Sequence, residues 1–89
     1  MLETKALIDF VLQDPRIKEE LSAISELVGY DEFINTLIKA LREAKEKIAV
    51  ERYKEGKITL SELKRVLNVS EWEIDDILKK YGVYRKYEL

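Results

Sequence analysis

The sequence contains no cysteine and no histidine, and it has only one proline and three glycines among its 89 residues. Without cysteine, the chain can form neither a disulfide framework nor a thiolate zinc site. Without histidine or cysteine it also lacks the commonest general base, nucleophile and metal ligands, and its carboxylates show neither catalytic pairing nor the spacing of a calcium loop. We therefore expect no enzyme activity, no catalytic residue, no metal site and no cofactor.

Long apolar runs are absent as well. No run approaches the roughly 18 residues that span a bilayer. The N-terminal residues Met1 to Lys5 lack the basic start and apolar core of a signal peptide. We therefore expect a cytoplasmic protein that is neither secreted nor inserted in a membrane. Abundant Glu, Lys and Ile with few amides favour an origin in a hot environment.

The charge is nearly balanced, with 16 basic and 18 acidic residues and a formal net charge of -2. This balance argues against a histone-like protein that binds nucleic acid through bulk charge. Hydrophobic residues make up 46% of the chain and charged residues 38%. Such a composition is typical of a folded domain with charges on its solvated helix faces.

The spacing of the apolar residues predicts an all-α fold of about five helices. The expected ranges are about 2–12, 15–28, 32–53, 60–67 and 71–81. Gly29, Gly56 and Gly82 stand where helices should end, and because they are isolated they form no phosphate-binding loop. We expect one domain over residues 1–89: an N-terminal three-helix bundle (1–56), a helix-turn-helix (57–82) and a tail (83–89) that is either a short strand or disordered.

Two helix-start signatures support the helix-turn-helix. Thr59 is followed three residues later by Glu62, and Ser70 by Glu73. In each pair the hydroxyl can accept from the third backbone N–H while the Glu accepts from the backbone N–H of the cap residue. Asn68 occupies the turn and tolerates a left-handed conformation. The apolar residues expected to lock the two short helices together are Leu63, Leu67, Val69, Ile74 and Ile77.

The run from Ala49 through Val83 extends this pattern. It reads Ala-Val-Glu-Arg-Tyr-Lys-Glu-Gly-Lys-Ile-Thr-Leu-Ser-Glu-Leu and continues through Tyr-Gly-Val. Residues 49–83 resemble an uncharacterised family of small prokaryotic helix-turn-helix proteins that are suspected antitoxins. The resemblance implies an antitoxin-like transcriptional regulator, whose partner would be DNA or a protein such as a toxin.

A DNA-binding protein of this kind places its second short helix in the major groove. We expect Lys64, Arg65 and Lys79 to contact phosphates, and Ser70 and Trp72 to contact the groove or a partner. Lys57, Arg85 and Lys86 could extend the phosphate contact.

The exposed face of that helix, however, is acidic on balance, with Glu71, Asp75 and Asp76 beside Trp72. Asp75 and Asp76 can pair with lysines four residues later on the same helix. The alternative function is therefore a protein-protein interaction module whose helix-turn-helix does not bind DNA. Trp72 either points to solvent as an anchor for a partner or packs back on the preceding helices.

The third predicted helix carries a further apolar seam. Ile34, Leu41 and Ile48 are seven residues apart, and Leu37 and Ala44 fill the positions between them. Such a seam could form a coiled coil in a dimer, but its two heptads favour packing within the chain. We nevertheless expect a homodimer, because one helix-turn-helix offers little binding area and symmetric regulators place two copies about 34 Å apart on DNA.

Overall fold

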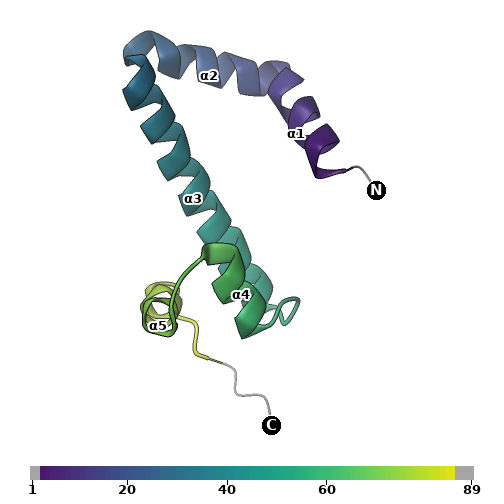
Figure 1. Ribbon diagram of the computed structural model, residues 1–89, viewed down its shortest axis with the longest axis vertical. Coiled ribbons are helices and arrows are strands. Elements are labelled where there is room, and N and C mark those ends of the chain that lie inside the picture. The colour runs from purple at the N-terminus through teal and green to yellow at the C-terminus, as the bar shows by residue number, and fades with distance from the viewer. Residues whose placement is uncertain (1–2, 86–89) are drawn as a thin grey trace. The chain divides into compact units, whose positions relative to one another are not determined.

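The computed structural model describes residues 3–85 and contains five α-helices and no strand in that range (Figure 1). The helices are α1 (Thr4–Gln13), α2 (Pro15–Leu27), α3 (Tyr30–Lys54), α4 (Leu60–Leu67) and α5 (Glu71–Lys80). The all-α prediction with five helices is confirmed. Within the tail, residues 83–85 are irregular rather than a strand, and residues 86–89 lie outside the described range.

The chain divides into two compact units, Met1–Ile38 and Lys39–Leu89, whose boundary lies within α3. The expectation of a single domain stays a prediction.

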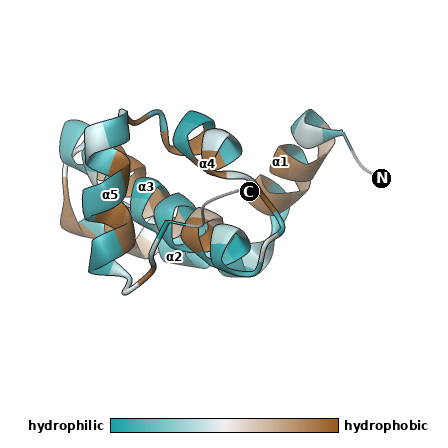
Figure 2. Ribbon diagram, turned by 90° about the horizontal axis from the view of Figure 1, so that it is seen from below, coloured by the Kyte–Doolittle hydropathy of each residue, from teal (hydrophilic) through white to brown (hydrophobic). Residues whose placement is uncertain are grey.

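The first unit contains α1, α2 and the beginning of α3. Asp14 caps α2 by accepting a hydrogen bond from the Arg16 N–H at 2.8 Å, and Pro15 occupies the first helical position, as predicted. α1 packs against α2. No side chain of either helix is buried, although apolar residues make up most of α1 (Figure 2). α1 and α2 therefore contact each other without burying a side chain, because helices of 10 and 13 residues enclose too little volume for a core. The expected N-terminal bundle over residues 1–56 extends across both units and stays a prediction.

The second unit has a small buried core. Leu63 of α4 and Ile74 of α5 are both fully buried, as the sequence predicts, and Leu67, Val69 and Ile77 are half-buried around them. α3 closes the other side of this core. The six buried residues are Ala49, Val50, Tyr53, Leu63, Ile74 and Leu78. Three helices therefore hold one apolar centre, to which α3 contributes only the last two turns of its length.

Local hydrogen bonds explain where the helices of this unit begin and end. The capping box at Thr59 is complete, with both bonds to Glu62 at 3.1 Å. The second box is only half formed: Ser70 Oγ accepts from the Glu73 N–H at 3.3 Å, but the Glu73 carboxylate accepts from the Ser70 hydroxyl instead of its backbone N–H. Asn68 has the predicted left-handed conformation, with φ of 53°.

The helix ends share one pattern. At the C-terminal ends of α3, α4 and α5, one residue has a left-handed conformation. The N–H of the residue that follows it donates a hydrogen bond to the carbonyl five residues earlier, which is the Schellman motif. The left-handed residues are Gly56, Asn68 and Gly82. The left-handed Asn68 ends α4, and α5 begins after a connection of three residues, 68–70.

The apolar seam of α3 differs from the expectation. Leu41 is 67% exposed and Ile48 is 55% exposed. The short seam favours packing within the chain, which stays a prediction for the chain as a whole, but these two residues are not packed within the second unit. The reason is that α4 and α5 pack on the opposite side of α3, where Ala49, Val50 and Tyr53 lie.

Candidate functional site

The predicted site residues lie on α4, on α5 and at the joint between them. Lys64 and Arg65 belong to the last turn of α4, Ser70 is the N-cap of α5, Trp72 lies in the first turn of α5 and Lys79 in its last turn. Their side chains have different surroundings, and these decide which of them can meet a ligand.

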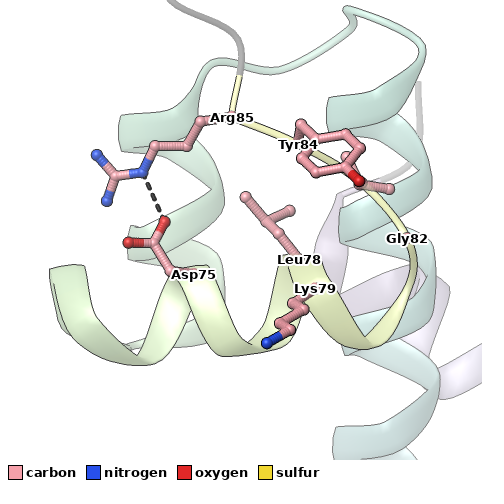
Figure 3. Close-up of a pocket in the computed structure, with 7 residues that line it drawn as sticks. Asp75, Leu78, Lys79, Gly82, Tyr84 and Arg85 are labelled. Carbon is pink, nitrogen blue, oxygen red and sulfur yellow. Dashed lines mark hydrogen bonds and ion pairs between the residues drawn. The ribbon is translucent and has the colours of Figure 1, made fainter.

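Glu71 is the centre of an ion-pair network at the start of α5. One carboxylate oxygen pairs with Lys64 Nζ and the other with the Arg85 guanidinium. Arg85 also donates from Nε to Asp75 at 2.7 Å (Figure 3). The hydrogen bond from Lys64, and after it that from Arg85, lowers the pKa of the Glu71 carboxyl. The two cations therefore neutralise much of the acidic charge that the sequence places on this helix.

This network changes the role predicted for Lys64. Its side chain is only 25% exposed and is held by Glu71, so a phosphate contact requires that pair to break. Arg65 and Lys79, in contrast, are exposed and have no ion-pair partner within residues 3–85. Of the three predicted phosphate contacts, two remain open to solvent and one is engaged.

The hydroxyl of Ser70 is also engaged. It accepts from the Glu73 backbone N–H and donates to the Glu73 carboxylate, both at 3.3 Å. Its position is explained by helix capping, and a ligand contact would replace the bond to the carboxylate.

Trp72 is 85% exposed. The indole therefore does not pack back on the part of α3 in its own unit, and the alternative is wrong for that helix. Tyr84, which the sequence analysis does not single out, is 89% exposed after the end of α5. The surface around α5 thus presents two large aromatic side chains to solvent beside a partly neutralised set of charges.

An open pocket of about 480 Å³ lies between α5 and the segment that follows it (Figure 3). Leu78 and Val83 supply apolar surface, and charged side chains stand at the rim. The lining residues are Asp75, Leu78, Lys79, Gly82, Val83, Tyr84 and Arg85. The pocket exists because Gly82, with φ of 68°, turns the chain back along α5.

Arg85 is predicted from the sequence as an additional phosphate contact, but the structure places it on Glu71 and Asp75. Lys86, the other predicted extension, lies outside the described residues. Lys57 pairs with Glu55 at 2.9 Å. The sequence contains no signal for the two pairs of Arg85, since they join residues 10 and 14 positions apart.

Residues 3–85 contain neither a membrane-spanning helix nor a cluster of metal ligands. None of the helices there combines the length and apolarity that a membrane crossing requires. No three Asp or Glu side chains gather closely enough to hold a metal ion.

A family model described as an uncharacterised protein family (UPF0175) matches residues 31–89, about two thirds of the chain. The matched range includes the run 49–83 that carries the predicted resemblance, together with nearly all of α3. No curated protein and no solved structure matches the chain.

Proposed function

This chain belongs to the uncharacterised protein family UPF0175, and we propose that it is a small regulatory or adaptor protein of the antitoxin kind. In this proposal α4 and α5 form a helix-turn-helix whose main ligand is a protein partner, such as a toxin. Three features support the helix pair: its connection of three residues, the left-handed Asn68 and the shared burial of Leu63 and Ile74.

The exposure of Trp72 carries the proposal. The Trp72 side chain is 85% exposed, so most of its apolar surface is not buried by the fold. Trp and Tyr anchors supply much of the binding energy of protein interfaces, and Tyr84 adds a second aromatic side chain. Because Lys64 and Arg85 already pair with Glu71, a partner can cover this surface without burying a carboxylate that has no counter-charge.

The test compares two exposed aromatic residues. Trp72→Ala should leave the circular dichroism spectrum and the free energy of unfolding unchanged and should abolish co-purification with the protein encoded by the adjacent gene. Tyr30→Ala is the matched control, since Tyr30 is 77% exposed but lies at the start of α3. Unfolding of the Trp72 variant, or an intact complex, would contradict the proposal.

DNA binding is the second candidate, favoured by Arg65 and Lys79, which are exposed and have no ion-pair partner among the described residues. Each of these residues should contact one phosphate. Arg65→Ala and Lys79→Ala should therefore each make the slope of log affinity against log salt concentration shallower by about one for mixed duplex DNA. Glu71→Gln should increase DNA affinity, because it releases Lys64 and Arg85. Absence of binding even at about 50 mM salt would eliminate this candidate.

We further propose that the protein acts in the cytoplasm as a homodimer. A dimer supports both candidates, because it doubles the exposed aromatic surface for a partner and provides two helix pairs for a symmetric DNA site.

A further inference from the structure

α3 has two apolar faces within the second unit, and the unit uses only one of them. On one face Ala49, Val50 and Tyr53 are 6%, 2% and 3% exposed beneath α4 and α5. On the other face Leu41 and Ile48 are more than half exposed.

Ala44, also exposed, lies between Leu41 and Ile48 on the same face, at helical spacings of three and four residues. We refer to Leu41, Ala44 and Ile48 as the outer seam. All helices of the second unit are accounted for on the opposite side of α3, so the outer seam is left for a partner outside this unit.

We propose that the outer seam is the homodimer interface and that two α3 helices pair along it in antiparallel orientation. Leu41 of one copy then packs against Ala44 of the second copy, and the same contact recurs on the other side of the twofold axis. This inference deepens the homodimer proposed above by naming its surface and direction, and it is independent of the Trp72 site.

The shape of the seam favours a second copy over an unrelated helix. Leu41 and Ile48 are seven residues apart and Ala44 fills the position between them, which is the repeat that packs against an identical repeat in a neighbouring helix. A large residue opposite a small one fills the layer without a void or a clash. The seam is therefore complementary to itself when Leu41 meets Ala44.

Charges beside the seam select the antiparallel orientation. In a parallel pair Lys47 would lie beside Arg52 of the second copy, and this repulsion would occur twice. In the antiparallel pair centred on Leu41 and Ala44, Lys47 lies opposite Ala40 instead. Lys47 has no ion-pair partner within residues 3–85, whereas Arg52 pairs with Glu55 at 3.3 Å. That exposed pair weakens the repulsion in the parallel orientation but leaves the charge of Lys47 uncompensated.

The first experiment measures the dimer dissociation constant of the full chain by sedimentation over a range of concentrations. Leu41→Glu and Ile48→Glu should each raise this constant at least about 100-fold, because two charges would enter the apolar seam. Val66→Glu is the control: Val66 is 45% exposed in the same unit but lies on α4, and its substitution should leave the constant within about threefold. A wild-type chain that is monomeric at about 1 mM would overturn the inference.

The second experiment tests the orientation and exploits the absence of cysteine from the chain. Under mild oxidation a mixture of Leu41→Cys and Ala44→Cys chains should form mixed disulfide dimers in preference to either self-paired dimer. A disulfide requires Cα atoms within about 7 Å, which the antiparallel pair meets between residues 41 and 44. Ile48→Cys chains should not self-pair, because the two copies of residue 48 lie about 16 Å apart along the axis of the antiparallel pair. Efficient self-pairing of Ile48→Cys would show a parallel dimer and refute the proposed orientation.

These cysteine variants avoid a buried charge, so they test the interface even if the glutamate variants fail to fold. Trp72→Ala should remain dimeric in both experiments. Loss of the partner complex and loss of the dimer are therefore separate results, which distinguish failure of the proposed function from failure of this inference.

Discussion

Glu46 connects the end of α5 to α3 and provides a quantitative test of the second unit. Its Oε1 accepts hydrogen bonds from Lys80 Nζ and from the Tyr81 hydroxyl, both at 3.0 Å. The Glu46 side chain is 24% exposed, whereas that of Lys80 is 65% exposed. Tyr81 is half-buried against the core. We predict that replacing Glu46 lowers stability mainly through the loss of the bond from Tyr81.

The expected size follows from these exposures. An exposed ion pair contributes about 0–1 kcal/mol. A hydrogen bond to a charged acceptor contributes about 1.5–3 kcal/mol, the lower end applying to this partly solvated group. Glu46→Gln keeps an acceptor for Tyr81 but loses the charge, so it should lower the free energy of unfolding by about 1 kcal/mol. Glu46→Ala should cost about 2 kcal/mol, measured by urea denaturation at pH 7.

A double-mutant cycle with Tyr81→Phe tests the reasoning directly. Glu46→Ala and Tyr81→Phe should show a coupling energy of about 1 kcal/mol, because both remove the same bond. Additivity of the two substitutions to within about 0.3 kcal/mol would refute the role assigned to this bond.

The pH dependence gives an independent check. The hydrogen bond from Lys80 lowers the pKa of the Glu46 carboxyl below its ordinary value of 4.5, against a smaller opposing effect of burial. The ionised form is therefore favoured in the folded state, and its contribution to stability is complete above pH 4.5 and is lost as the pH falls through the lowered pKa. The stability difference between wild type and Glu46→Gln should shrink over this acid range. A difference that stays constant there would contradict the assignment.

Three further predictions concern core packing and helix ends. Leu63→Ala, at a fully buried position, should lower the free energy of unfolding by about 2–5 kcal/mol, whereas Leu27→Ala, at a residue that is 83% exposed, should change it by less than about 0.5 kcal/mol in the same urea assay. Thr59→Ala should cost about 1 kcal/mol in chemical denaturation and more than Ser70→Ala, because only Thr59 has a complete capping box. Asn68→Ala should lower the melting temperature through a cost of about 1 kcal/mol in the left-handed conformation, whereas Asn68→Gly should not.

The elements of this fold could be predicted from the sequence because the signals that define them are local. The hydroxyl of Thr59, the left-handed Asn68 and Gly82 each act within five residues of the helix end that they define. The buried side of α5 could also be predicted from the sequence, since Ile74 and Leu78 recur at helical spacing.

The charge partners could not be predicted in the same way. The sequence suggests that Asp75 pairs with Lys79, four residues later, but the structure pairs Asp75 with Arg85. An i,i+4 pair contributes only about 0.2–0.5 kcal/mol, so a cation supplied by another segment readily replaces it. Lys80 likewise pairs with Glu46 on α3 rather than with its neighbour Asp76. Which segments meet is a tertiary property, and spacing along one helix contains no information about it.

The same argument applies to Trp72 and to the α3 seam. Periodicity gives the direction in which Trp72 or Leu41 points, and it gives both directions correctly. Whether another element covers that side depends on how many helices pack there, and α4 and α5 both pack on the other side of α3.

The exposure of Trp72 has a practical consequence, because it is the chain's single tryptophan. An indole that is in water before and after unfolding changes its fluorescence little when the chain denatures. Its emission should shift to shorter wavelength only when another molecule covers it. The intrinsic tryptophan fluorescence of this protein is therefore a poor reporter of folding. It is instead a direct, label-free reporter of association at α5.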